Sequence, residues 1–455
     1  MAIARDRDVP DGAEANSGSP RALALRLAAR AEPGPAGRPH PGQAAERYAQ
    51  TEGSVRPDPQ PAAIRTSFSD FDPTLIKESF ARVMADPPRA MEYFYARLFV
   101  QNPQIRALFP HAMTRTRSAV FQALARLVRS IDNPQECERL LRQLACDHRK
   151  FGVKEKHCQP FFDALLATAE HVSGPAWTAA QDAAWRAAGG HFAAVMSAAA
   201  VQDAAEQPAW WVGEIVQHDL RTATIAVITI RPDRPLSYVP GQHVAVQVPR
   251  WPRIWRSYSL ANAPRDNGLL DIHVRAVPGG TLSTALVGQC GAGDTLVLGA
   301  ARGDMRVTND ADRDLVCIAG GTGLAPLKAM IESVIGATRH GRRRAITLYL
   351  GVRRPQDLYD MRDLQTLQLG YPSLTLIPVA EQELDGSGLT ARLPQVVNMH
   401  PSFRDTDVYI SGPEAMVRAT AAALSRRVPA QCLHHDPLDE LLAASGSAAA
   451  EYLSR

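Results

Sequence analysis

The sequence has few of the features that mark membrane or secreted proteins. It contains no long uninterrupted run of apolar residues, so we expect no membrane-spanning helix. Its six cysteines include no CxxC pair, which favours reduced thiols over a disulfide framework. Charged residues interrupt the first stretch and no apolar segment follows it, so no secretory signal is predicted. These absences predict a protein that works in the cytoplasm.

The chain also has little net charge. A formal charge of +3 over 455 residues provides no strongly basic surface for nucleic acid or a membrane. The hydrophobic fraction of 45% is ordinary for a globular protein, and the chain is too long for one hydrophobic core. We therefore expect several domains, small molecules as partners, no nucleic acid or membrane partner, and a monomer.

Both ends of the chain lack periodic hydrophobicity. Residues 1–66 are rich in Ala, Pro, Gly and Arg, and bury too little apolar surface to offset the entropy of ordering. We predict a disordered tail there, with "RALALRLAARA" (21–31) as a candidate short helix. Residues 441–455 are predicted to be frayed.

Between these tails the pattern changes twice. Residues 67–204 have a period of 3.6, are dominated by Ala and Leu, and are broken at Asp-Pro and Asn-Pro pairs, which predicts an all-α domain. Residues 205–312 form short alternating runs between Gly and Pro, such as "TATIAVITIRP", and predict an antiparallel β-barrel. Residues 313–440 alternate apolar strands with helical patterns, which predicts an α/β domain with a parallel sheet.

Motifs in the β-barrel part resemble those of ferredoxin–NADP reductase-like proteins. "YVPGQ" (238–242), "RSYS" (256–259) and "PGGTLSTAL" (278–286) stand in the order found in that family. An arginine offers a planar fork of donors to a flavin pyrophosphate, aromatic rings cover the flavin, and glycines let backbone amides approach phosphates. The resemblance implies an FAD site formed by Tyr238, Arg256, Ser257, Tyr258, Ser259, Gly279, Gly280, Thr281 and Ser283.

The same resemblance extends into the α/β part. "GGTGLAP" follows an apolar strand where the family seats the nicotinamide pyrophosphate at a helix N-terminus, and "SGPEAM" matches a second nucleotide contact. Arg353 and Arg354 either favour a 2′-phosphate or lie at a solvated strand end, so NADH and NADPH stay open. The family's aromatic lid over the flavin aligns with Leu438. The implied NAD(P)H site comprises Gly320, Gly321, Thr322, Gly323, Leu324, Ala325, Pro326, Ser411, Gly412 and Pro413.

The helical part resembles the globin of flavohaemoglobins. "YFYARLFVQNPQIRALFP" (93–110) matches their signature, with Tyr95 on the second helix and Phe109 at the following corner. In that register "DHRKFGV" makes His148 the proximal haem ligand. His148 ends an apolar helical pattern, as a ligand facing a buried iron should, whereas His157 lies in the charged "KEKH". Tyr95, a buried donor, is the expected distal residue.

Three positions depart from the flavohaemoglobin pattern. The distal glutamine position holds Thr116, with Val120 one turn later in the pocket. Behind the proximal histidine, the family's tyrosine is replaced by Cys158, a weak donor. Its glutamate aligns with Ala200, unless a slip of register offers Gln202, Asp203 or Glu206 in its place.

The resemblance implies an enzyme that passes electrons from NAD(P)H through FAD to haem b, and converts nitric oxide and O2 to nitrate. Two alternatives remain from the sequence. The proximal departures would also suit a flavohaem oxidoreductase acting on another substrate, with weak nitric oxide dioxygenase activity. A non-enzymatic oxygen or redox sensor would need no complete reductase and is the weaker alternative.

Overall fold

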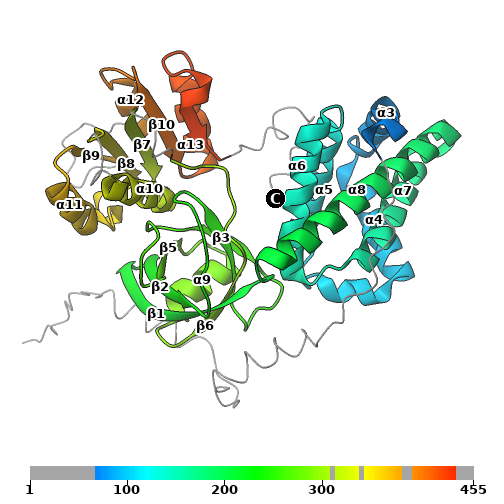
Figure 1. Ribbon diagram of the computed structural model, residues 1–455, viewed down its shortest axis with the longest axis horizontal. Helices are drawn as coiled ribbons and strands as arrows, with labels where there is room; N and C mark the ends of the chain where they lie inside the picture. The colour runs from blue at the N-terminus through cyan, green and yellow to red at the C-terminus, as the bar shows by residue number, and fades with distance from the viewer. Residues whose placement is uncertain (1–66, 308–312, 338–342, 382–391, 437–455) are drawn as a thin grey trace, which may run out of the picture.

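The computed structural model describes residues 67–307, 313–337, 343–381 and 392–436. Three parts follow one another along these residues, from the blue and green helices to the orange and red α/β part in Figure 1. The predicted tails, the candidate helix at 21–31 and Leu438 lie outside the described residues. No described helix is both long and apolar enough to cross a membrane.

Capping residues explain where several helices of the first part begin. Asp72 and Asp86 each stand before a proline, and their carboxylates accept backbone N–H groups of the next turn. Asn133 caps the helix that begins at Pro134 in the same way. The Asp-Pro and Asn-Pro pairs are therefore helix starts. The main helices are α3 (Pro73–Val83), α4 (Pro87–Gln101), α5 (Thr114–Ser130), α6 (Pro134–His148), α7 (Cys158–Ser173) and α8 (Ala179–Glu206).

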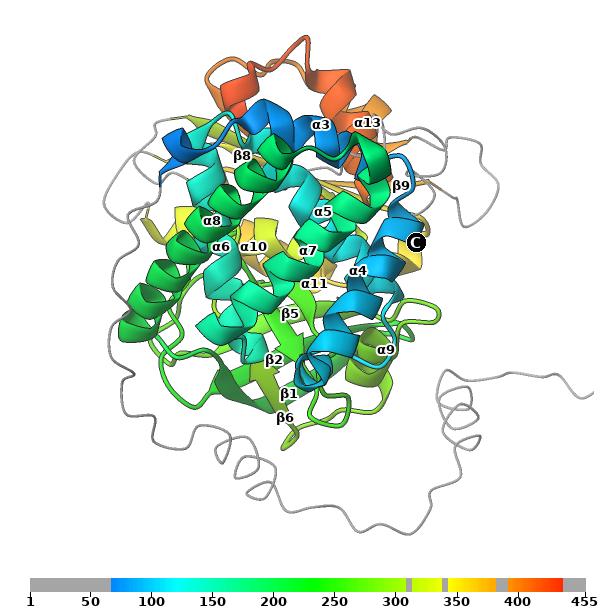
Figure 2. The same cartoon turned by 90° about the vertical axis from the view of Figure 1, so that its right-hand side faces the viewer.

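These helices pack around one apolar core. Side chains of α3, α4, α5, α6, α7 and α8 all contribute to it, and Phe94, Tyr95 and Phe121 are among its most buried members. Figure 2 shows α7 and α8 crossing the front of this part, with α3 and α4 beside them. The region between Gln101 and Thr114 holds only a short 3₁₀-helix, so α4 turns a corner before α5.

The second part is an antiparallel sheet that curls onto itself. Its six strands are ordered β4-β3-β6-β1-β2-β5, and Leu260, directly after β4, bridges Ile272 of β5, so the two edge strands meet. This contact closes the sheet into a barrel around a core of Val, Ile and Leu. Its elements are β1 (Trp211–Thr222), β2 (Ile225–Pro232), β3 (His243–Gln247), β4 (Arg256–Ser259), β5 (Leu270–Arg275), α9 (Thr281–Gly288) and β6 (Thr295–Leu298).

The third part is a parallel sheet with helices on both faces, ordered β11-β10-β7-β8-β9. Alternate residues of β7 face opposite sides: Leu315 and Cys317 pack with α10, while Val316 and Ile318 pack with α12 and α13. Its elements are β7 (Asp314–Gly320), α10 (Leu324–Ala337), β8 (Ile346–Val352), α11 (Met361–Gly370), β9 (Leu374–Ala380), α12 (Leu393–Asn398), β10 (Thr406–Ser411), α13 (Glu414–Leu424) and β11 (Leu433–His435).

The fold class predicted from the sequence is confirmed. An all-α part, an antiparallel barrel and a parallel α/β part occur in the predicted order. The carboxyl ends of the parallel strands β7 and β10 lie at the same edge of the sheet, where "GGTGLAP" and "SGPEAM" begin. This adjacency brings the two motifs of the predicted nucleotide site together.

Candidate functional site

His148 is the last residue of α6, as the sequence pattern predicted. Its Nδ1 lies 2.5 Å from the carbonyl oxygen of Leu144, one turn earlier, and donates a hydrogen bond to it when this nitrogen carries the proton. Burial lowers the pKa of His148, which keeps the ring neutral near pH 7. A neutral imidazole oriented through Nδ1 presents Nε2 as a metal ligand.

The residues expected on the distal side lie on α4, α5 and the corner between them. Tyr95 is only 2% exposed, and Phe109 meets its ring edge-on with the centroids 5.6 Å apart. Thr116 and Val120, in the first two turns of α5, are half-buried. The distal side thus combines the phenol of Tyr95, which lies among aromatic rings, with the short hydroxyl side chain of Thr116. The family carries a glutamine at the position of Thr116.

The interior of the helical part suits a large apolar group such as haem. Several apolar side chains pack against the core yet keep partial exposure, and they come from the corner, from α5, from α6 and from α7. With a neutral histidine at the end of α6, such a set provides a nitrogen ligand within apolar surroundings. The residues that share this property are Phe109, Met113, Val120, Leu124, Leu144 and Phe161.

The structure shows the surroundings of the two proximal positions that depart from the family pattern, Cys158 and Ala200. Cys158 is the half-buried first residue of α7, and burial raises the pKa of its thiol. Ala200 carries no polar group, and the acid of this region is Asp203, which is 8% exposed on α8. Burial raises the pKa of Asp203, but hydrogen bonds from Gln207 and Arg149 outweigh this and lower it. Asp203 is therefore bonded to Arg149 and Gln207, whereas the ring of His148 is bonded to the backbone of Leu144.

The predicted flavin contacts of the barrel include the whole of β4 and Tyr238, which precedes β3. Tyr238 donates a hydrogen bond from its hydroxyl to the carbonyl of Asn262, 2.9 Å away, and is half-buried. Arg256, Ser257, Tyr258 and Ser259 form β4, in register against β3. Burial raises the pKa of Tyr258 to about 12, so its phenol stays protonated at neutral pH.

Arg256 is placed where an anion would be stabilised. Burial lowers its pKa, and the positive charge of Arg115 on α5 lowers it further. A second positive charge in the surroundings of Arg256 favours an anion such as a phosphate. Arg115 was not predicted from the sequence, because only the fold brings the start of α5 to β4.

The glycine turn before α9 fits the role predicted for it. Gly279 has a φ of +72°, which side chains other than glycine adopt at a cost. A Cβ on Gly280 would lie 2.6 Å from Oγ of Ser283, whose hydroxyl in turn accepts the backbone N–H of Val277 at 3.2 Å. Thr281 begins α9, so this turn presents a helix N-terminus.

The two motifs predicted for the nicotinamide nucleotide meet backbone to backbone. A Cβ on Gly323 would lie 2.3 Å from the carbonyl oxygen of Ser411, and one on Gly320 would lie 2.9 Å from Cδ of Pro413. Gly321 has a φ of +53°. Thr322 lies within the same 3₁₀ turn, and Leu324, Ala325 and Pro326 begin α10 as buried residues. Gly412, with a φ of +152°, continues the second motif.

Arg275 is a second cation that the sequence reasoning missed. It ends β5, and a Cβ on Gly321 would lie 3.1 Å from its Nη2, so its guanidinium covers the glycine turn. The signal was available in "HVRAVPGG", where an arginine stands just before the other glycine turn. Arg353 and Arg354 are exposed after β8, which leaves their nucleotide preference open.

A buried polar cluster joins the barrel to the α/β part. Lys328 of α10 donates to Asp360 at 2.8 Å, and Arg221 of β1 donates to Asp363 at 2.9 Å. His273 of β5 is hydrogen-bonded to the hydroxyl of Tyr359 at 2.7 Å. Lys328 and Asp360 are almost fully buried, and each has a second ionic partner: Asp363 lies 3.6 Å from Lys328, and Arg221 lies 3.5 Å from Asp360. These contacts fix the nucleotide turn relative to the flavin motif.

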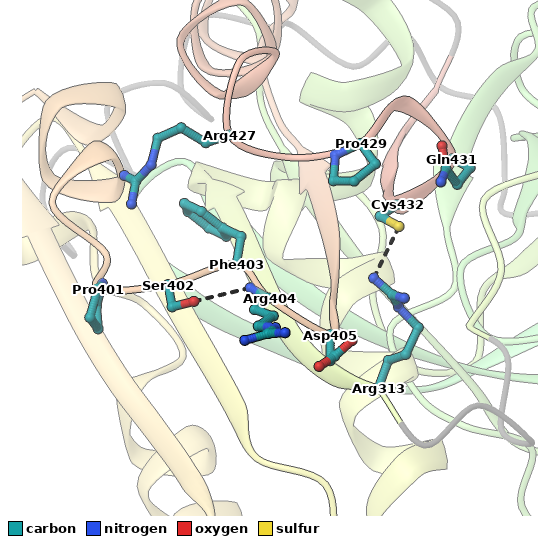
Figure 3. Close-up of a pocket in the computed structure, with 10 residues that line it drawn as sticks. All are labelled: Arg313, Pro401, Ser402, Phe403, Arg404, Asp405, Arg427, Pro429, Gln431 and Cys432. Atoms are coloured by element: carbon teal, nitrogen blue, oxygen red, sulfur yellow. Dashed lines mark hydrogen bonds between the residues drawn. The ribbon is translucent and has the colours of Figure 1, made fainter.

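A cavity of about 570 Å³ lies at the opposite edge of the parallel sheet, where β7 and β10 begin (Figure 3). Two of its arginines, Arg313 and Arg427, already have protein partners. Arg313 donates to Cys432 at 3.0 Å, and Arg427 lies over the ring of Phe403 and donates to the carbonyl of His400 at 2.8 Å. The cavity is therefore separate from the glycine turns, which follow the other ends of these strands.

Comparisons with known proteins match each part to a family. Residues 92–196 match the globin family, residues 212–306 the oxidoreductase FAD-binding domain, and residues 317–422 the oxidoreductase NAD-binding domain. A flavohemoprotein of Bordetella pertussis is 27% identical over 361 residues, covering 73% of this chain and 89% of that protein. The chain is a globin joined to an FAD- and NAD-binding reductase, and it is similar to flavohemoproteins. The three matched domains confirm the predicted cofactors haem, FAD and NAD(P)H.

Other comparisons are less complete or show the fold alone. The flavohemoglobin of Malassezia yamatoensis, solved with FAD and heme, aligns with a TM-score of 0.66 at 16% identity, covering 79% of this chain and 97% of that one. The xylene/toluene monooxygenase electron transfer component of Pseudomonas putida is 34% identical over 206 residues, covering 44% of this chain. The chain covers only 57% to 64% of the length of that relative and three further reductase-type relatives.

The flavin site can be tested by substitution in the barrel. We expect Arg256→Ala combined with Ser259→Ala to yield flavin-poor protein with FAD affinity lowered by about tenfold or more, because charge-assisted hydrogen bonds contribute roughly 1.5–3 kcal/mol. Flavin absorbance per protein after gel filtration measures this. Arg250→Ala, an exposed arginine stacked on Trp251 in the same domain, is the matched control. Full FAD occupancy in the double variant would contradict the assignment.

Proposed function

We propose that this protein is a nitric oxide dioxygenase, which uses electrons from NAD(P)H to convert nitric oxide and O2 to nitrate. One observation carries the proposal: a complete FAD- and NAD-binding reductase is joined to a globin that combines His148 at a helix end with a buried Tyr95. The described residues join this reductase to the globin on one chain, so the globin is a covalent neighbour of the reductase.

The residues of the chain have separable roles in this proposal. Bound FAD would accept hydride and release single electrons, and haem would bind O2. The glycine turns at Gly320 and Gly412 would seat the nicotinamide nucleotide, while Arg256 and Tyr258 would hold the flavin. Nε2 of His148 would hold the iron. Tyr95 would keep a hydroxyl proton on the distal side, where a hydrogen bond stabilises negative charge on oxygen.

The departures at Cys158 and Ala200 affect the expected rate of nitric oxide turnover. A polar network behind a ligating histidine raises its basicity, and here the position of the tyrosine holds Cys158 and that of the glutamate holds Ala200. The sulfur of Cys158 is a weak hydrogen-bond donor, and Ala200 offers none. We therefore propose a turnover with nitric oxide below that of members with both groups.

Nitric oxide consumption tests the function directly. We expect the full-length holoenzyme to consume nitric oxide in the presence of NAD(P)H and O2 and to form nitrate in equal amount, as an electrode and nitrate assay would measure. Tyr95→Phe should slow this by about tenfold or more, because a hydrogen bond to a charged group contributes roughly 1.5–3 kcal/mol. It should also speed the loss of O2, measured by flash photolysis.

The matched control is Tyr93→Phe on the same helix. Tyr93 stacks on His171 with the ring centroids 4.0 Å apart. Its aromatic contact is thus a different one from that of Tyr95 with Phe109. Equal effects of the two substitutions would contradict the distal role of Tyr95.

A second candidate is a flavohaem oxidoreductase that acts on another reduced substrate. It is favoured by Cys158 and by the 34% identity of the reductase half to the electron transfer component named above. The same assay separates the two, because this candidate oxidises NAD(P)H with O2 but consumes nitric oxide only weakly, so that nitrate formation accounts for little of the NAD(P)H oxidised.

A further inference from the structure

The barrel contacts the globin beside its proposed iron ligand. Nε of Arg302, which follows β6, donates to Oδ1 of Asp147 at 3.4 Å, and Nη2 lies 3.6 Å from Oδ1 of Asp203. Asp147 is the residue before His148 on α6, and Asp203 lies in the last turn of α8. One barrel arginine therefore bridges the ends of two globin helices, and Figure 1 shows the end of α8 reaching the barrel.

On the globin side the two carboxylates belong to a tight cluster. Arg149, directly after His148, pairs with Asp203 and donates to the carbonyl of Gln207 at 3.0 Å. The side chains of Arg149 and Asp203 are 13% and 10% exposed. Lys150 pairs with Asp147 at 3.4 Å. Residues on both sides of His148 are thus held by groups that also meet the barrel.

On the barrel side Arg302 is tied to the flavin motif through the backbone. Arg302 and His243 exchange two backbone hydrogen bonds, of 2.9 and 2.8 Å. His243 is in turn paired across the sheet with Ser259, the last residue of "RSYS". The contacts therefore run without a break from the neighbour of His148, through the Arg302 side chain and two strand pairings, to Ser259.

Burial and direction distinguish this cluster from an ordinary surface contact. The side chain of Arg302 is 20% exposed and faces two carboxylates, whereas Arg139 and Asp304, another pair between globin and barrel, are 48% and 70% exposed. Desolvating charges offsets most of their attraction, so a partly buried pair adds little stability. The hydrogen bond from Arg302 to Asp147 and the ion pair with Asp203, which is 10% exposed, still hold the two surfaces in one orientation. The ion pair of Arg139 and Asp304, at 3.3 Å, is exposed to solvent, which weakens it, so that it restricts the orientation of the two domains far less.

We propose that Arg302 is a positioning residue for electron transfer between the two cofactors: its bridge to Asp147 and Asp203 sets how the flavin-binding barrel approaches the end of α6. The proposal rests on the electron route of the proposed function, from FAD to haem. It also gives Asp203 a role, because the acid that stands three residues beyond the family's glutamate position serves the domain contact.

Rapid mixing of the holoenzyme with NADH, without O2 and under carbon monoxide, tests the proposal. Flavin reduction is followed near 450 nm and haem reduction in the Soret band. We expect Arg302→Ala to reduce its flavin at the wild-type rate and its haem at least tenfold more slowly. Arg139→Ala, at the exposed edge of the same contact, should change neither rate.

Further readouts separate positioning from a structural role. The haem midpoint potential and haem content of Arg302→Ala should match the wild type, and Arg302→Lys should recover part of the rate. Hydrogen exchange of the backbone over 144–151 should rise in Arg302→Ala and not in Arg139→Ala. Double-mutant cycles with Asp203→Asn should show coupling in the haem reduction rate.

Three results would overturn the proposal: wild-type haem reduction in Arg302→Ala, equal slowing in both arginine variants, or slowing accounted for by a shifted midpoint potential or lost haem. If Arg302→Ala fails to fold, Arg302→Lys and Asp203→Asn supply the comparison. Because nitric oxide and O2 are absent, failure of nitric oxide dioxygenation leaves this result unaffected.

Discussion

His148→Ala is expected to abolish the Soret band of the purified protein. His148 is the last residue of α6, its ring is oriented by Leu144 and it is neutral near pH 7, so its Nε2 is able to hold the iron. Without the imidazole of His148, haem would be held mainly by apolar contacts. The measurement is the ratio of Soret to protein absorbance, with flavin content as the internal reference because FAD lies in another domain.

His157→Ala is the matched control for this experiment. His157 lies only nine residues later, in a 3₁₀ turn, where its Nδ1 accepts the backbone N–H of Lys154 at 3.0 Å. We expect an unchanged Soret band from this variant. His148→Gly with added imidazole distinguishes a lost ligand from a misfolded domain, since free imidazole should restore the haem spectrum. The opposite pattern, with His157 required and His148 dispensable, would overturn the ligand choice.

The fold was predictable because its signals are local. Asp-Pro and Asn-Pro pairs start helices, alternating runs form the barrel, and apolar runs before glycine turns form the parallel sheet. The placement of His148 at a helix end was also local, since the apolar residues that precede it at helical spacing lie on the same helix.

Contacts between distant segments were not predictable in this way. The sequence left Asp203 as one of several replacements for a missing glutamate, and the structure pairs it with Arg149 and Arg302. Arg302 lies about a hundred residues further on, in another domain, and no periodicity links the two. Arg115 and Arg275 were missed for the same reason, because their relevance depends on elements that meet only in the fold.

These long-range contacts lie at the two junctions between neighbouring domains. The charged cluster at Arg302 joins the globin to the barrel, and the cluster of Arg221 and Lys328 joins the barrel to the α/β part. Each junction lies beside a predicted cofactor contact, Ser259 in the first case and the glycine turn in the second. Electron transfer depends on such geometry, whereas the stability of each domain depends on its own apolar core.

Gly323→Ala should have the largest effect in the reductase half. The methyl group would lie 2.3 Å from the carbonyl oxygen of Ser411 and 2.6 Å from Cα of Gly412, both backbone atoms that cannot rotate away. The turn must therefore separate from the end of β10, and overpacking of this kind typically costs about 1–3 kcal/mol. We expect the KM for NADH to rise at least tenfold and flavin reduction by NADH to slow.

Gly336→Ala provides a control in α10, the helix that follows the turn of Gly323. A Cβ there meets nothing within 4 Å, and alanine is a better helix former than glycine by roughly 1 kcal/mol. We expect this variant to keep wild-type kinetics. FAD content and the Soret band should be normal in both variants, and dithionite should reduce both haems equally, because the damage is confined to the nucleotide turn. A wild-type KM in Gly323→Ala would show that the approach of the turn to β10 does not shape the nucleotide site.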